Sequence, residues 1–301
     1  MHEPRYTVCI LKPSENPMSL KQQALDIIAR LNAEDKRSHI QVRSRLSKQP
    51  LPLTASKIGG RPYLPEGQDV PTTADGKPLS LVAQINCAEL PANAIYPPSG
   101  ILQFWMSAHD YLWGMDLDDP ISQKGSRVIY YPEISEPRED VLTTPINWDD
   151  YGFPWQEDEE YALHFTAADS IPWWLYSDED EQRFIAAWNA AYPQQTIADF
   201  YDLDGLGEGD IADDILEDIE ENNEELHRIG GVPIFTQNDP RDENKALRGY
   251  SVNLLTIVSD FSEEEEGEIM WGDAGTANWL ITPEQLAARD FSKVLFEWAC
   301  G

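Results

Sequence analysis

The segments SKIGGRPYLPEG at residues 56–67 and HRIGGVP at residues 227–233 share one pattern: a basic residue, Ile-Gly-Gly, and a proline two residues after the second glycine. A glycine pair permits positive φ and close approach of another chain segment, and a following proline favours an extended backbone. Bare backbone amides at such a turn can also hold an anion. No helix pattern follows either turn and the chain is strongly acidic, so we favour a structural turn that leads into a strand.

Short apolar runs follow both glycine pairs in the same order. β-branched and aromatic runs bounded by Pro, Gly and Asn are typical of strands, and strands in fixed order with variable connections indicate a repeat. We infer an internal duplication, in which each copy supplies part of a mostly antiparallel sheet. The paired runs are LVAQIN (81–86) with LLTIVS (254–259), GILQFW (100–105) with GTANWL (275–280), and RVIYY (127–131) with KVLFE (293–297).

Helical periodicity occurs at residues 19–32, 178–192, 211–226 and 282–289. The sequence therefore predicts an α+β fold, internally duplicated, with two mostly antiparallel β units packed together and a few peripheral helices. The expected parts are an N-terminal helix and strand (1–45), a first repeat (46–138), an acidic, aromatic-rich helical insert (139–226) and a second repeat (227–301), together forming one compact bilobal unit.

The composition favours a basic partner. The 301 residues include 54 acidic and 22 basic side chains, which gives a net charge of −32. Such a charge repels nucleic acid and anionic membranes and attracts cations. The three cysteines, Cys9, Cys87 and Cys300, form no C-x-x-C pair. No signal-peptide pattern or membrane-spanning stretch is present, so we expect a protein of the cytoplasm.

Most of the negative charge lies between the two copies. Residues 139–226 contain 26 Asp and Glu but one Lys or Arg, Arg183, so this segment carries −25 of the total −32. Trp and Tyr are interleaved with the carboxylates, and this mixture is typical of an interface for a cationic protein. An aromatic core beneath a solvated acidic face explains the composition equally well. The candidate partner-binding residues are Glu157, Asp158, Glu159, Glu160, Trp173, Trp174, Asp178, Glu179 and Asp180.

The combined motifs resemble a known family. The first copy, SKIGGRPYLPEG with PLSLVAQINCAELP, GILQFW and LWGMDLDDPISQKGSRVIYY, is similar to the YwqG-like family, a bacterial domain family of unknown function. The resemblance extends to three motifs near the C-terminus, HRIGG, MWGDAGTANWLITPEQL and DFSKV. It spans most of residues 45–134 and 227–298. Two positions depart from the family pattern. The chain has Val70-Pro71 where the family usually has Trp-Pro, and the second copy has Thr256 where the family has a Gln; the first copy keeps this residue as Gln84. The resemblance implies a fold but no catalytic residues. Its members can lie beside toxin genes, which implies an immunity role by association.

Catalytic motifs are absent from the sequence. No H-E-x-x-H, G-x-S-x-G or Walker A pattern occurs, and the five histidines are scattered. Carboxylates such as Asp116, Asp118 and Asp119 are too abundant for any one pair to indicate a glycosidase. DLDGLGEGDIAD at 202–213 resembles a calcium-binding loop, but Leu206 and Asp213 stand where an oxygen ligand and a bidentate Glu are expected. We therefore expect no cofactor, no metal and little or no calcium binding.

Three hypotheses for function follow. The first is an acidic immunity protein that neutralises a cationic, probably co-encoded toxin, for example a nuclease, by covering its active surface. The second is an uncharacterised carboxylate-dependent enzyme, and the third is a structural or calcium-binding module. The charge of residues 139–226 favours the first hypothesis, which needs no enzymatic activity.

Overall fold

The computed structural model describes residues 18–34, 38–141, 152–168, 178–207, 209–221, 227–260 and 267–301. The chain divides into two compact units. The smaller unit falls within residues 1–31 and 181–222, and the larger unit within residues 32–180 and 223–301. Within the described ranges, no helix combines the length and the apolar composition that crossing a bilayer requires.

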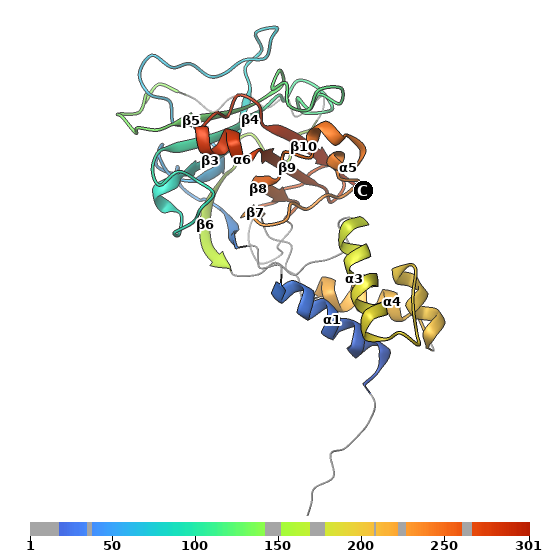
Figure 1. Cartoon of the computed structure of the whole chain (residues 1–301). Coiled ribbons are helices and arrows are strands. Elements are labelled where there is room, and N and C mark those ends of the chain that lie inside the picture. Colours follow the sequence, from blue (N-terminus) through green and yellow to red (C-terminus); the bar gives the residue numbers. More distant parts are fainter. Residues whose placement is uncertain are drawn as a thin grey trace, which may run out of the picture. The chain divides into compact units, whose positions relative to one another are not determined.

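The smaller unit is helical. It is built from α1 (Leu20–Glu34), α3 (Asp178–Ala191), the 3-10 helix η2 (Phe200–Leu206) and α4 (Ile211–Glu221), which Figure 1 shows together. The rings of Phe184 and Phe200 pack edge to face at 5.3 Å, and Lys21 pairs with Asp218 at 2.8 Å. The helices expected near residues 19–32, 178–192 and 211–226 are confirmed over these bounds. The apolar stripe of each amphipathic helix is thereby buried.

The larger unit is one sheet of ten strands, in the order β10-β9-β8-β7-β1-β6-β2-β3-β4-β5. Every neighbouring pair is antiparallel. Two short helices, α5 (Pro240–Glu243) and α6 (Pro283–Ala288), and the 3-10 helices η1 (Cys87–Glu89) and η3 (Lys245–Leu247) lie in its connections. The strands are β1 (His39–Leu46), β2 (Lys57–Gly59), β3 (Ser80–Asn86), β4 (Ile101–Met106), β5 (Ser126–Tyr131), β6 (Glu160–Ala168), β7 (His227–Gly230), β8 (Val252–Val258), β9 (Thr276–Ile281) and β10 (Leu295–Ala299).

This sheet corrects the expected fold class. An α+β protein with two duplicated β units packed together is wrong, because one continuous antiparallel sheet with few helices contains both glycine-pair segments. Strands β1 and β6 join them: β1 pairs with β6 along its whole length and also with β7, while β6 pairs with β2. Matching the two sequence copies could not reveal this, since β1 and β6 lie outside the runs that recur. Strand β6 lies in residues 139–226, the segment that also contains α3, η2 and α4.

The sheet curls around its core. The ring of Phe104 on β4 packs against Trp279 on β9 at 5.4 Å, although β4 and β9 are not neighbours in the sheet. One large cluster of buried apolar side chains draws on strands from both ends of the sheet. The inward faces of distant strands therefore share a single hydrophobic core, which is the main stabilising feature of this unit.

Both glycine pairs have the expected left-handed conformation. Gly59, Gly60, Gly230 and Gly231 have φ between +66° and +76°. A Cβ on Gly60 would lie 2.3 Å from the carboxylate of Glu160, and a Cβ on Gly230 would lie 2.2 Å from Cδ1 of Ile95. Each turn therefore favours glycine for its φ, and a side chain at Gly60 or Gly230 would have to displace the end of Glu160 or of Ile95.

Candidate functional site

An aromatic cleft of about 400 Å³ opens beside the first glycine pair. Its walls come from residues 152–156, which precede β6, from residues 268–272, between β8 and β9, and from Trp113 in the β4–β5 connection. The amide of Met270 donates to the carbonyl of Pro154 at 2.7 Å and so joins the first two segments. A Cβ on Gly59 would lie 2.8 Å from Trp155 Nε1, so the glycine lets this wall approach.

The cleft is backed by closely packed rings. Phe153 and Trp155 meet edge to face at 4.9 Å, and Trp113 stacks on Trp298 at 4.2 Å. Trp113 also contacts Trp271 at 5.5 Å. The three rings that line the cleft, Trp113, Phe153 and Trp155, are between 2% and 5% exposed, so the wall is preformed and does not depend on a ligand to assemble.

Backbone strain accompanies the position of Trp113. Its φ is +48°, a left-handed value that is unfavourable for a bulky residue. The next residue, Gly114, packs so tightly on Gly125 that an added Cβ would lie 1.9 Å from the Gly125 carbonyl oxygen. The indole Nε1 of Trp113 is buried and has no hydrogen-bond partner in the part of the chain that the structure describes. Such strain at a cleft wall points to a functional position.

Two carboxylates give the cleft its charge. Glu159 Oε2 accepts from the Gln156 amide at 3.0 Å and from the Tyr161 hydroxyl at 2.8 Å. That hydroxyl in turn accepts from the Glu268 amide at 3.0 Å. Burial, followed by the hydrogen bond to Glu159, raises the pKa of Tyr161 well above its usual range. Tyr161 therefore stays protonated and orients Glu159, while Glu268 lines the same cleft with an exposed side chain.

The chemistry of the cleft suits a cation. Its described lining contains two glutamates and no Lys, Arg or His. Aromatic faces attract cations through their quadrupole, most strongly Trp, and nearby carboxylates add Coulomb attraction. The sequence next to the two walls is also acidic, with Asp149-Asp150 before one and Glu263–Glu266 before the other, although both runs lie outside the described residues.

The nine residues predicted to bind a partner are not all in one place. Glu159 lies in the cleft, and Glu157 and Asp158 are exposed on the turn before it. Glu160 faces inward and forms a 2.7 Å ion pair with the buried Lys57. Trp173 and Trp174, and the side chains of Asp178 and Glu179, lie outside the described residues; Asp180 is half-buried on α3.

The cleft residues that sequence reasoning missed are Trp113, Phe153, Trp155, Glu268 and Met270. Phe153 and Trp155 belonged to the aromatic set of residues 139–226 without being singled out. A Trp-Gly pair occurs twice, at 113–114 in the β4–β5 connection and at 271–272 in the β8–β9 connection. The two tryptophans meet in the structure, so this recurring pair was the signal that could have located the cleft.

Two other sequence features have structural roles. Gln84, whose counterpart in the second copy is Thr256, is fully buried. Its amide nitrogen donates to the carbonyls of Leu53 and Ala55 at 2.7 and 2.8 Å. In the calcium-like loop, Asp202 accepts from the amides of Ala198 and Asp199, and Asp204 accepts from Ala212. These aspartates cap helical turns.

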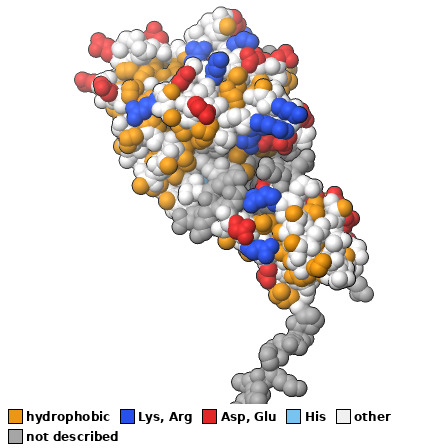
Figure 2. All heavy atoms as spheres, in the orientation of Figure 1, with side chains coloured by type: hydrophobic (Ala, Val, Ile, Leu, Met, Phe, Trp, Pro, Cys, Tyr) orange, Lys and Arg blue, Asp and Glu red, His pale blue; other side chains and the backbone are white. Residues whose placement is uncertain are grey.

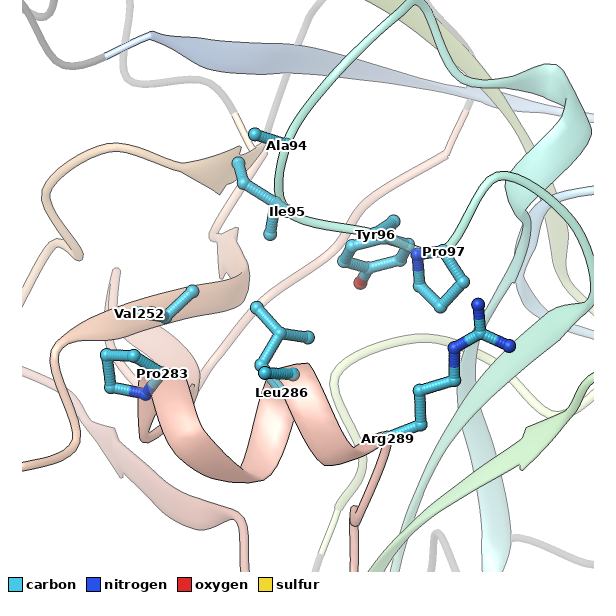
Figure 3. Close-up of a pocket in the computed structure, with 9 residues that line it drawn as sticks. Ala94, Ile95, Tyr96, Pro97, Val252, Pro283, Leu286 and Arg289 are labelled. Atoms are coloured by element: carbon cyan, nitrogen blue, oxygen red, sulfur yellow. The ribbon is translucent and has the colours of Figure 1, made fainter.

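A second, apolar pocket of about 440 Å³ lies between the loop at residues 94–97 and helix α6. Figure 3 shows Ile95 and Tyr96 facing Leu286, with Val252 and Pro283 toward one end and Arg289 at the other. Among the described residues of its lining, Arg289 and Tyr96 are the ionisable ones. The Tyr96 hydroxyl is already used, since it donates to the carbonyl of Leu254 at 3.0 Å.

The described surface is mixed in charge. Figure 2 shows basic and acidic side chains, with hydrophobic ones between them, on one face of the larger unit. Within the described ranges, no group of three or more His, Cys, Asp or Glu side chains is placed to hold a metal ion. The aromatic cleft and the apolar pocket are therefore distinguished by shape and lining more than by surface charge.

Comparison with known proteins gives a family and no activity. A family model described as a domain of unknown function, DUF1963, matches residues 56–300. The match begins just before the first glycine pair and extends through β10, so it includes both glycine pairs and all residues of both pockets. No curated protein matches the chain.

Proposed function

Because the chain belongs to the DUF1963 family, whose function is not established, we propose from the aromatic cleft that it binds a cationic protein, one of whose basic side chains enters the cleft. The observation that carries this proposal is the pairing of Trp113, Phe153 and Trp155 with Glu159 and Glu268 in one cavity. A Lys or Arg side chain has an apolar stem for the rings and a charge for the carboxylates.

The net charge of −32 supports the same assignment at longer range. It accelerates the approach of a basic protein, while the cleft supplies the short-range contact that distinguishes one basic protein from another. The specific form of the proposal is an immunity protein of the cytoplasm that occludes the active surface of a co-encoded cationic toxin. The resemblance to YwqG-like proteins supports this specific form, because members of that family can lie beside toxin genes.

A defined peptide tests the cleft. A peptide of six lysines separated by glycines is titrated into the full-length protein at 150 mM salt, and tryptophan fluorescence is followed. Saturable binding is expected to perturb the cleft tryptophans. The double variant Glu159→Gln with Glu268→Gln should weaken binding about fivefold or more, since about 1 kcal/mol corresponds to that factor.

A matched control separates the cleft from the overall charge. Glu66→Gln with Glu133→Gln removes the same two charges from exposed positions outside the cleft. Any basic peptide is attracted to so acidic a protein, so equal weakening by the two double variants would contradict cleft binding. Trp155→Phe, which keeps an aromatic ring but weakens the attraction for a cation, should lower the affinity while the fold is retained. For a toxin encoded next to this gene, the cleft variant should lose protection in cells when the control does not.

A further inference from the structure

The apolar pocket has the properties of a preformed small-molecule site. Asn93 fixes its loop wall, because Oδ1 accepts from the amides of Ile95 and Tyr96 at 3.0 and 2.7 Å. Ile95 also packs directly on Gly230 of the second glycine pair. The volume of about 440 Å³ lies within the range usual for ligand pockets.

The opposite wall is equally well defined. Helix α6 begins with a capping box between Thr282 and Gln285 and has Pro283 in its first turn. These features hold Leu286 in place facing Ile95 and Tyr96 (Figure 3). Both walls are therefore ordered by contacts within the protein, so little conformational entropy is lost when a ligand binds.

Arg289 occupies an unfavourable backbone position. It ends α6 with φ +55°, in the left-handed region where glycine is the usual residue. Its amide closes the helix by donating to Gln285 and Leu286, which glycine would do without strain. An arginine near a helix C-terminus interacts well with the helix dipole, but α6 has only six residues and that benefit does not require the left-handed position. The side chain therefore needs another explanation.

Arg289 is exposed, and its guanidinium interacts electrostatically with the Tyr130 hydroxyl. Among the described residues, no carboxylate lies within ion-pair distance of the guanidinium, and the guanidinium donates no hydrogen bond. In Figure 3 its side chain extends beside Pro97, at the end of the pocket away from Val252 and Pro283. A cationic fork at one end of an apolar pocket matches a ligand with an apolar body and an anionic head.

We propose that this pocket binds a small amphiphilic carboxylate, with the apolar part between Ile95 and Leu286 and the carboxylate on Arg289. Guanidinium and carboxylate form paired, charge-assisted hydrogen bonds, and the apolar walls bury the rest of the molecule. The net charge of the protein disfavours anions at long range, but at physiological salt this repulsion is screened beyond about 8 Å. The proposal is independent of the aromatic cleft and of any cationic partner.

Octanoate is the probe, and methyl-labelled full-length protein reports its position by NMR. Saturable shifts are expected at the methyl groups of Ile95, Val252 and Leu286. Octanol, which has the same chain length without the charge, should bind about tenfold more weakly than octanoate. Arg289→Gln should reduce octanoate affinity to that of octanol, whereas Arg248→Gln, an exposed arginine outside the pocket, should leave it unchanged.

Three results would overturn the proposal: no saturable shift up to 5 mM octanoate, equal affinity for octanoate and octanol, or equal affinity in wild type and Arg289→Gln. Ala94→Trp is a second variant, placed at an exposed position of the loop wall to fill the cavity. It should abolish binding of both probes while the remaining methyl spectrum stays native. Unchanged octanoate binding by this folded variant would place the ligand elsewhere.

Discussion

Glu159 and Glu160 are adjacent in the sequence, but the strand that begins here sends their carboxylates to different places. Glu159 lines the aromatic cleft, held by Gln156 and Tyr161. Glu160 lies over Gly60 and neutralises Lys57, whose side chain is fully buried. Successive side chains of a strand point to opposite sides, so one residue is available to a ligand and the next is part of the fold.

Glu297 shows how burial changes the pKa of a carboxyl group. It lies on β10, where Asn278 Nδ2 donates to its carboxylate at 3.1 Å. Burial, to which the nearby Asp239 adds, raises the pKa of Glu297 to about 7 from a usual value of 4.5. The folded protein therefore holds this proton more tightly than the unfolded chain does.

We predict that this carboxyl makes stability fall as the pH rises. Because the pKa of Glu297 is higher in the folded protein than in the unfolded chain, its bound proton stabilises the fold. This contribution is fully present below pH 4.5 and is lost as the pH rises through about 7. The loss is at most about 3 kcal/mol, at 1.36 kcal/mol for each pKa unit. The loss is measured by urea unfolding of wild type and Glu297→Gln between pH 4.5 and 8, as the difference between their two curves of unfolding free energy against pH. Parallel curves would contradict the prediction, and the comparison removes the contributions of other titrating groups such as His227.

At the scale of elements, the pairing of β2 with β6 connects the two outer parts of the sheet. Strand β2 has only three residues, and β6 contributes the neighbouring strand from a part of the chain about 100 residues away. The ion pair between Lys57 and Glu160 crosses this junction, and Glu160 Oε2 also accepts from the Leu51 amide at 2.8 Å. So short a strand depends on these side-chain contacts for its register.

We predict that Glu160→Gln destabilises the protein by about 3 kcal/mol, because it leaves the buried Lys57 charge without its partner. Burial already lowers the pKa of Lys57, and the hydrogen bond to Glu160 opposes this change. Urea unfolding measures the loss. Glu157→Gln, an exposed neighbour, should be nearly neutral, and the double variant Lys57→Met with Glu160→Met should recover most of the stability. Equal stability of Glu160→Gln and wild type would show that the pair does not support the junction.

The ion pair between Lys57 and Glu160 also constrains tests of partner binding. A charge reversal across residues 157–160 would place a lysine beside Lys57 and damage the sheet. Variants of Glu157, Asp158 and Glu159 that retain Glu160 are the appropriate ones.

At the scale of the whole molecule, a net charge of −32 is carried by a chain of 301 residues. Self-repulsion of like charges opposes the compact state, and salt screens it. Raising the salt from 10 to 150 mM shortens the screening length from about 30 Å to about 8 Å.

We therefore predict that the midpoint of thermal unfolding at pH 7.5 rises by several degrees over this range of salt. Differential scanning calorimetry in NaCl and KCl checks it, and the two salts should act alike if screening is the cause. A midpoint that falls or stays constant would mean that paired charges, such as Arg138 with Asp69 and Asp140, outweigh the general repulsion.

The sequence by itself determined the local structure. The glycine pairs, the short apolar runs and the helical stripes depend on neighbouring residues, and their turns, strands and helices are found where these patterns lie. It also determined the net charge of −32, because charge is a sum over residues and does not depend on the fold.

Only the tertiary structure decided how these parts combine. That β1 and β6 join both halves in one sheet follows from pairing between distant segments, which local periodicity does not encode. The same holds for the two pockets: Trp113, Trp155 and Glu268 line one cleft because the sheet curls, and Leu286 faces Ile95 because α6 packs beside a loop almost 200 residues away (Figure 3). A site made of residues far apart in the chain exists only once long-range packing brings them together.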